Sequence, residues 1–284
     1  MKTKLILIEG IPGSGKTTFA KKISEWYQRR DIAANCYLEG NLHPADLGWN
    51  ACIPLRKFNE ICRKYELLEE QIKLNTVFEG DTAIIAYTQV KTDNRSFYSE
   101  MAEFEVYDGK VSDEVFFQLH YDRWNSFYEA TVTKDEINIF ECAFLQNHVN
   151  ELLFWRNSSD DEVISHLKKL VGSVKLLSPV LIYLSQPNIE KTIRHISEER
   201  VSKEYGNWID HCISYCENSP YGKQNNLKGF EGVLRIFSVR KELELKATPI
   251  LSIPYVIIEN VNNNWDYVWE QIISFLSTID NSII

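Results

Sequence analysis

The sequence predicts an α/β protein, with a five-stranded parallel sheet flanked by helices on both faces. Five short apolar runs are expected to be its strands, at residues 5–8, 33–38, 137–140, 179–184 and 253–258. Stretches with helical periodicity separate them, and this alternation is typical of parallel sheets. With 284 residues, the chain is long enough for one large domain, and we expect a single domain over residues 1–284.

The loop after the first strand carries the most specific motif in the chain. Residues 10–18 read GIPGSGKTT, which fits the pattern Gly-x-x-x-x-Gly-Lys-Thr. In this motif, backbone N–H groups and the start of the next helix cradle phosphates, the lysine reaches the terminal phosphates, and the threonine hydroxyl binds Mg²⁺. An ordinary glycine-rich turn is the alternative, but the strand before the loop and the helical pattern over residues 17–30 favour a phosphate loop.

We therefore expect this loop to bind ATP and Mg²⁺. The residues expected to contact the nucleotide are Gly10, Pro12, Gly13, Ser14, Gly15, Lys16, Thr17 and Thr18. Of these, Lys16 is also expected to act in catalysis, and Thr17 to bind the metal.

Acidic residues follow the second and third expected strands. Glu39 and Glu141 stand at the two strand ends, and Asp46 follows Glu39 within reach. Because ligands bind beyond the carboxyl ends of parallel strands, these carboxylates should lie on the edge that carries the phosphate loop. We expect Glu39 to take a proton from the acceptor, Glu141 to bind the metal or act on the acceptor side, and Asp46 to bind substrate. Each could instead cap the helix that follows it.

The second and third expected strands are too far apart for one crossover helix. We therefore expect an acceptor-side insertion at about residues 52–132, largely helical. Within it, residues 58–74 and 113–130 look helical, residues 81–90 could be a strand or a buried helix, and Asp108-Gly109 marks a turn.

One basic residue of the insertion, Arg123, is expected to contact the acceptor. Its stem could instead pack against Trp124 and Tyr128. The insertion is rich in aromatic residues, on which a planar nucleobase would stack, but a helical core would explain them equally well.

The fourth expected strand leads into a basic segment, residues 185–206. Ile189, Ile193 and Ile196 share one helical face, which leaves Arg194 and Arg200 free to point towards a ligand. Cations that reach a transferring phosphoryl group stabilise its charge, and a lid that closes over the phosphates would carry them. The alternative is a solvated helix in which Arg194 pairs with Glu198.

The fifth expected strand is followed by an apolar helical stripe that should cover the sheet. Its members are Trp265, Val268, Trp269, Ile272, Ile273 and Leu276.

Charge and composition limit the kinds of partner that we expect. Lys and Arg total 31 against 40 Asp and Glu, a formal charge of −9, which argues against a surface that coats nucleic acid. No apolar stretch is long enough to span a membrane, so we expect none. A small-molecule acceptor is the expected partner, and a homodimer is possible.

The six cysteines show no paired framework. The first strand begins almost at once and leaves no room for an export signal, so we expect reduced thiols and a cytoplasmic protein. His211, Cys212 and Cys216 could suggest a metal site, but no second ligand pair follows, and packing is the expected role.

These segments resemble the P-loop nucleoside and nucleotide kinases, including deoxynucleoside and thymidylate kinases. GIPGSGKTT resembles their phosphate loop, and Glu39 in YLEGN resembles the carboxylate base of the deoxynucleoside kinases. FECAFLQNHVNELL, residues 140–153, resembles their segment after strand three, with Cys142 where an arginine usually stands. The stretch after VLIYLSQP resembles their lid. The resemblance implies a five-stranded parallel sheet, ATP and magnesium.

The sequence thus predicts a phosphotransferase that acts on a small molecule, with a nucleoside or nucleotide as the leading acceptor. A kinase of another hydroxyl compound, such as a sugar-like or antibiotic-like molecule, is one alternative. A regulatory NTPase with a protein partner is another, although the strings Asn-Lys-x-Asp and Asp-x-x-Gly of GTPase switches do not occur. Nor does the third expected strand end in the Asp-Glu pair common in motor ATPases.

Overall fold

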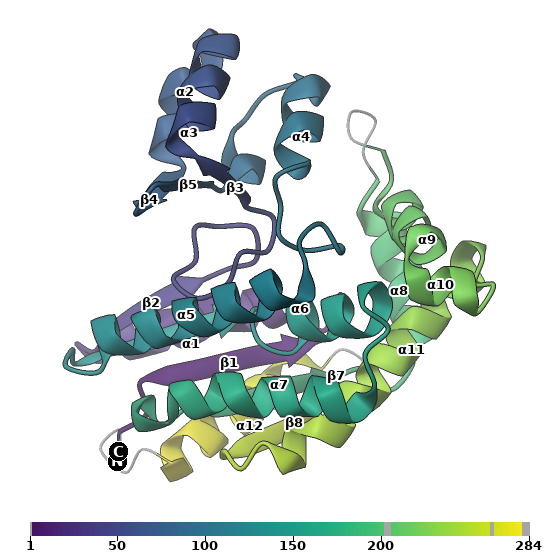
Figure 1. Cartoon of the computed structure of the whole chain (residues 1–284). Coiled ribbons are helices and arrows are strands. Elements are labelled where there is room, and N and C mark those ends of the chain that lie inside the picture. The colour runs from purple at the N-terminus through teal and green to yellow at the C-terminus, as the bar shows by residue number, and fades with distance from the viewer. Residues whose placement is uncertain (1, 202–205, 262–263, 280–284) are drawn as a thin grey trace.

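The computed structural model describes residues 2–201, 206–261 and 264–279. Within them, the main sheet has five parallel strands in the order β2-β6-β1-β7-β8 (Figure 1). The strands are β1 (Leu5–Gly10), β2 (Ala33–Tyr37), β6 (Glu136–Glu141), β7 (Val180–Ser185) and β8 (Tyr255–Glu259). Each overlaps one of the expected apolar runs. The predicted five-stranded parallel sheet is therefore confirmed.

Helices cover both faces of this sheet, because successive side chains of a strand point to opposite sides. Ile6 and Ile8 of β1 pack in one buried cluster with residues of α1 (Lys16–Gln28) and α12 (Trp265–Ile279). Leu5 and Leu7 belong to the cluster on the other face, which includes residues of α5 (Asp113–Thr131), α7 (Asp160–Ser173) and α11 (Gly229–Ala247). The result is a layered helix–sheet–helix core.

The stripe expected on the last helix is largely confirmed. Val268, Ile272 and Leu276 of α12 are buried against the sheet. Trp269 is partly buried and stacks on Phe19 of α1, with the ring planes 8° apart. Trp265, at the start of α12, is 42% exposed and lies beside the phosphate loop instead.

Further helices follow β6 and β7. They are α6 (Gln146–Val149), which continues into a π-helix (Asn150–Trp155), then α8 (Ile189–Glu199), α9 (Trp208–Asn218) and α10 (Pro220–Gln224), with short 3-10 turns at Lys175–Leu177 and Thr248–Ile250. Figure 1 shows α8, α9, α10 and α11 grouped at one end of the main sheet.

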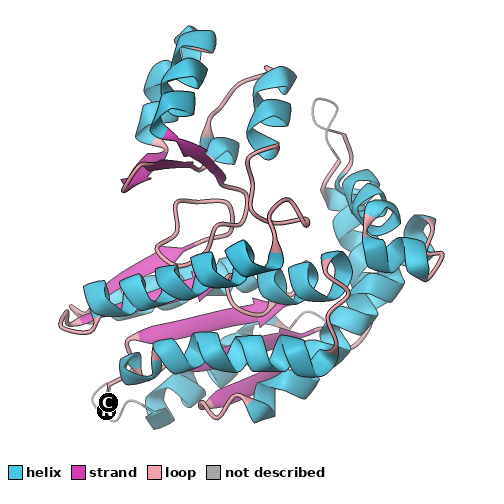
Figure 2. Ribbon diagram, in the orientation of Figure 1, coloured by secondary structure: helices cyan, strands magenta, loops and turns pink. Residues whose placement is uncertain are grey.

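The insertion between β2 and β6 contains the helices α2, α3, α4 and α5, and also a feature that the sequence did not predict. It contains a second, antiparallel sheet in the order β3-β5-β4, which we call the small sheet, with helices beside it (Figure 2). Before α5, the elements of the insertion are β3 (Ala51–Pro54), α2 (Leu55–Lys64), a 3-10 turn (Glu66–Leu68), α3 (Glu69–Leu74), β4 (Thr76–Glu79), β5 (Thr82–Ile85), a 3-10 turn (Tyr87–Gln89) and α4 (Arg95–Ala102). Residues 81–90, for which the sequence left a strand or a buried helix open, thus form a strand followed by a 3-10 turn. The turn at Asp108 and Gly109 is confirmed, with φ of 62° and 68°.

Among the described residues, no helix is both long and apolar enough to cross a membrane.

Candidate active site

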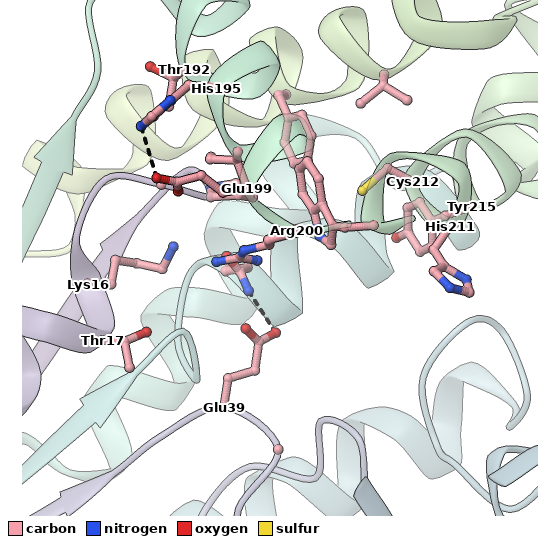
Figure 3. Close-up of a pocket in the computed structure, with 18 of the residues that line it drawn as sticks. Lys16, Thr17, Glu39, Thr192, His195, Glu199, Arg200, His211, Cys212 and Tyr215 are labelled. Atoms are coloured by element: carbon pink, nitrogen blue, oxygen red, sulfur yellow. Dashed lines mark hydrogen bonds and ion pairs between the residues drawn. The ribbon is translucent and has the colours of Figure 1, made fainter. Parts of the chain in front are cut away.

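A cleft of about 2100 Å³ runs across the carboxyl ends of the main strands. Each of the five strands sends residues into it from its carboxyl end: the phosphate loop follows β1, and the others contribute Glu39, Glu141, Gln186 and Asn260. Figure 3 shows Lys16, Thr17 and Glu39 around one space, with residues of α8 and α9 beside it. This is the edge of a parallel sheet at which ligands bind.

Two glycines of the phosphate loop are required both by their backbone conformation and by the close approach of neighbouring elements to the loop. Gly10 and Gly13 have φ of 143° and 78°, which side-chain-bearing residues rarely adopt. A Cβ on Gly10 would lie 2.4 Å from the Leu184 carbonyl oxygen, and a Cβ on Gly13 would lie 2.1 Å from Cδ1 of Ile196. The loop is therefore held directly against β7 and α8.

Lys16 is buried under this loop, at 6% exposure. Its Nζ donates a hydrogen bond to the Ile11 carbonyl oxygen at 3.0 Å, so the ammonium group stays within the loop that would surround a phosphate chain. It also lines the cleft.

Thr17 and Glu141, the two residues expected to bind the metal, lie in contact. The Thr17 hydroxyl donates to Glu141 Oε1 at 2.9 Å, and the backbone N–H of Glu39 donates to Glu141 Oε2 at 3.0 Å. A hydroxyl and a carboxylate side by side are hard oxygen ligands, the kind that Mg²⁺ takes together with phosphate oxygens and water. The residues present thus fit the expected ion.

Glu39 is held at the end of β2 by two donors. Its Oε1 accepts hydrogen bonds from Gln146 Nε2 at 2.8 Å and from Trp49 Nε1 at 3.2 Å. Burial raises the pKa of Glu39, and the nearby Glu141 carboxylate raises it further. A carboxylate with a raised pKa that faces the cleft is a suitable general base.

Trp49 was not singled out in the sequence, and it has an unusual backbone. Its φ is 60°, in the left-handed region that costs a bulky residue about 1–2 kcal/mol. Its side chain is 52% exposed and lines the cleft beside Glu39. Strain of this kind often marks a functional position.

Glu9, also unforeseen, shapes the turn between β6 and α6. Its carboxylate accepts the backbone N–H groups of Phe144 at 2.9 Å and of Gln146 at 3.0 Å. The chain can reach these positions because Cys142, directly after Glu141, has a φ of 67°. Glu9 thereby fixes the turn that carries both Glu141 and Gln146.

Glu9 should make the stability depend on pH. Complete burial outweighs its two backbone hydrogen bonds and raises the pKa from 4.5 to about 8. The folded chain then keeps a proton that the unfolded chain releases above pH 4.5, so this contribution to stability is lost as the pH rises from about 4.5 to about 8. We expect the contribution of Glu9 to the free energy of unfolding to fall by about 2–5 kcal/mol over this window.

The variant Glu9→Gln isolates this contribution, because other titrating groups are common to both proteins. The difference in unfolding free energy between wild type and variant should shrink or reverse with rising pH. A difference that stays constant from about pH 5 to about pH 9 would show that Glu9 keeps one ionisation state in both folded and unfolded chains.

Arg240, on α11, supports the phosphate loop from behind. It is 1% exposed, and Nη2 donates to the Gly10 carbonyl oxygen at 3.2 Å. Its Nε lies 3.2 Å from the carboxylate of Glu244, which also accepts the Tyr183 hydroxyl at 2.7 Å. A helix more than two hundred residues away in sequence thus places a cation at the loop, and Arg240 also lines the cleft.

The structure does not bring Asp46, Arg123 or Arg194 into the cleft. Asp46 is 4% exposed and bonded to buried neighbours. Arg123 is 4% exposed, pairs with Glu79 of β4 and donates to the His43 carbonyl oxygen, and so links α5 to the small sheet.

Arg194 lies on the outer side of α8. It pairs with Glu190, four residues before it, rather than with Glu198 as the alternative had it, and its guanidinium lies over the Phe230 ring. The helix turns this side outwards because Ile193 and Ile196 are buried. For Asp46, Arg123 and Arg194, the geometry therefore disagrees with the expected roles.

Arg200, by contrast, lines the cleft at the end of α8, 5.5 Å from the ring centroid of Trp208. Residues 202–205 of the expected lid lie outside the described residues. Of the three candidates for a second metal site, Cys216 is buried in the core and Cys212 is partly buried against it, which agrees with packing, while His211 is exposed.

No protein-family model matches the chain, and none of the curated proteins matches its sequence. Among solved structures, it is similar to a shikimate kinase from Acinetobacter baumannii in complex with shikimate, at 10% identity and a TM-score of 0.39, over 100% of this chain and 97% of that one. It is also similar to a thymidylate kinase from Ehrlichia chaffeensis, at 13% identity and a TM-score of 0.41, over 97% and 100%. Likenesses this weak support no conclusion about substrate.

Proposed function

We propose that the protein transfers the terminal phosphoryl group of ATP to a small-molecule acceptor in a magnesium-dependent reaction. The observation that carries this proposal is the convergence of Lys16, Thr17, Glu141 and Glu39 in one cleft, at the carboxyl ends of three adjacent parallel strands. Phosphoryl transfer needs positioned phosphates, a metal and an oriented nucleophile, and these residues supply groups for all three.

The residues divide the reaction between them. Loop N–H groups and Lys16 would hold the phosphate chain, and Glu39 would accept the proton of the acceptor hydroxyl as its oxygen bonds to the terminal phosphorus and ADP leaves. Mg²⁺, held by Thr17 and Glu141, would neutralise charge on the phosphate oxygens. Arg200 and Arg240 line the same cleft and add positive charge.

A nucleotide is the acceptor that best suits the far side of the cleft. The segment after β5 places Lys91 and Arg95 there, and Trp49 offers an exposed ring beside Glu39. Two cations favour an acceptor that already carries a phosphate, and an indole ring suits a planar base. A nucleoside monophosphate combines both features.

The first test is acceptor-dependent turnover. The protein is incubated with ATP and Mg²⁺, with and without pooled nucleosides, nucleoside monophosphates, sugars and aminoglycosides, and ADP is measured. Production of ADP that requires nucleosides or nucleoside monophosphates supports the proposal. Turnover only with a sugar or an aminoglycoside would show that the acceptor is another hydroxyl compound rather than a nucleoside or nucleotide. Acceptor-independent hydrolysis stimulated by a protein would favour a regulatory NTPase.

Substitution of Lys91 tests the anionic acceptor. Lys91→Ala should raise the KM for a nucleoside monophosphate by about 10-fold or more and leave the KM for ATP unchanged, because a hydrogen bond to a charged group contributes about 1.5–3 kcal/mol. Arg63→Ala, in the exposed part of α2 and outside the cleft, is the control. Equal KM values for Lys91→Ala and wild type would argue for an uncharged acceptor.

A further inference from the structure

A second group of polar side chains lies outside the cleft, inside the core. Asp46, Tyr107, His120 and His148 come from the loop after β2, the turn before α5, α5 itself and α6, and none is more than 9% exposed. One ligand atom from each of Asp46, His120 and His148 lies within 4.8 Å of the other two. Polar groups are costly to bury in an apolar core unless they are paired, so such a cluster calls for a physical reason.

Hydrogen bonds on the outer side of the cluster fix the orientations of Asp46, His120 and His148. His120 Nδ1 lies 2.9 Å from the Phe116 carbonyl oxygen, and His148 Nδ1 lies 3.1 Å from His166 Nε2. Asp46 Oδ2 accepts the Gly48 N–H and Asn147 Nδ2, each at 2.9 Å. The atoms left to face inwards are Asp46 Oδ1 and the Nε2 atoms of the two histidines. Outer partners of this kind are what hold metal ligands in place.

The inner atoms have too few protons to satisfy one another. The Tyr107 hydroxyl lies 2.5 Å from Asp46 Oδ1 and 3.0 Å from His120 Nε2, and its single proton can go to only one of them. His120 must carry its own proton on Nδ1 to bond the Phe116 carbonyl, which leaves Nε2 an acceptor. His148 Nε2 is buried and finds no hydrogen-bond partner among the residues that the structure describes.

Burial disfavours the charged form of both histidines, so extra protons do not fill this deficit. Burial lowers the pKa of His120 to about 3 and that of His148 well below its usual value. A neutral imidazole is the form that binds a metal ion.

We propose that Asp46, His120 and His148 bind a divalent zinc ion in the core. The Tyr107 oxygen would be the fourth ligand, and its hydroxyl proton, now donated to Asp46, would be released to solvent as the ion binds. Two imidazoles and a carboxylate form a donor set that suits Zn²⁺, whereas Mg²⁺ prefers oxygen ligands and water. Zn²⁺ bonds of about 2.0–2.1 Å place tetrahedral ligand atoms about 3.3 Å apart. The present separations lie on both sides of this value, from 2.5 Å between the Tyr107 and Asp46 oxygens to at most 4.8 Å among the ligand atoms of Asp46, His120 and His148, so the side chains would adjust around the ion. The site is closed to the cleft, and its role is structural.

This ion would tie the acceptor-side loop to the core. Asp46 lies in the loop between Glu39 and the small sheet, and His148 follows Gln146 and Asn147, which hold Glu39 and Asp46. The site is independent of the proposed function, because it needs neither ATP nor acceptor.

Metal analysis of the full chain without an affinity tag tests the proposal directly. After gel filtration we expect about one zinc per chain by plasma mass spectrometry, retained in His195→Ala, whose histidine is exposed on α8, and lost in His148→Ala. Zinc below about 0.1 per chain in the wild type, or equal zinc in His148→Ala and wild type, would overturn it.

A second measurement does not depend on whether His148→Ala folds. Wild-type protein stripped with a strong chelator is titrated with Co²⁺, which should give visible absorption bands of a tetrahedral site, and with Zn²⁺, which should raise the Tm by about 5 °C or more, since a ligand that binds only the folded state stabilises it. Mg²⁺ should do neither. No bands and no shift in Tm with Zn²⁺ would show that the cluster binds no such ion.

Discussion

Replacing Lys16 with alanine is expected to lower kcat/KM for phosphoryl transfer by about 10²–10⁴-fold, because a buried cation that contacts the terminal phosphates stabilises charge in the transition state. The fold should persist, since the Lys16 ammonium makes a single hydrogen bond among the described residues, to the Ile11 carbonyl oxygen. The measurement is ADP production at saturating acceptor, beside the thermal unfolding curve of each protein.

Lys21→Ala is the matched control, because Lys21 is an exposed lysine on the same helix and lies outside the cleft. It should retain the wild-type rate. If Lys16→Ala and Lys21→Ala were equally active, the phosphate loop would not be the nucleotide site, and the proposed function would fail with it.

Glu39→Gln is expected to lower kcat by about 10²–10⁴-fold, the usual contribution of a general base, while the Kd for ATP stays unchanged. Glutamine keeps the size of the side chain and its hydrogen bond from Gln146 but cannot take a proton. Since burial and Glu141 raise the pKa of Glu39, the wild-type rate should fall with decreasing pH earlier than an ordinary carboxylate would allow. The variant should lack this part of the pH profile.

Glu25→Gln, on the exposed side of α1, is the control for loss of a carboxylate. Calorimetry with ATP and Mg²⁺ separates binding from turnover in all three proteins. Full turnover of Glu39→Gln on the true acceptor would rule out its role as the base and leave phosphate binding by the loop untouched.

The main sheet could be predicted because its signals are local. Each strand is a short apolar run that ends in a polar residue or a glycine, and the phosphate loop lies within nine consecutive residues. Glu39 and Glu141 followed from the same logic, since strand ends of a parallel sheet meet at one edge. The structure places both in the cleft, with Glu141 bonded to Thr17.

The small sheet could not be predicted because its strands have four residues each, too few to show a period. β4 is also largely exposed, so it lacks the apolar run that marks a buried strand. Positive charge alone also did not show which basic residues of the insertion reach the cleft. Arg123 stabilises the junction with β4, whereas Lys91 and Arg95 line the cleft.

The supports of the site escaped prediction because they depend on long-range contacts. Arg240 meets Gly10 across 230 residues, and Glu9 meets Gln146 across 137. Glu9 lies in β1, the strand before the phosphate loop. An acidic residue within an otherwise apolar strand is the sequence signal that could have indicated its role. Nothing in the sequence pattern places Arg240 near the loop, because its position depends on how α11 packs.

The segment that forms the small sheet leaves the core after Asn50 and returns to it before Val106, and its two ends are joined where the Cys52 N–H donates to the Phe104 carbonyl oxygen at 2.9 Å. This segment contributes Lys91 and Arg95 to the cleft. Under the proposed function, the acceptor contacts of Lys91 and Arg95 and the nucleotide contacts of residues 10–18 would be encoded in separate stretches of the gene. Evolution could therefore replace the segment that contacts the acceptor and keep the nucleotide-binding part of the chain unchanged.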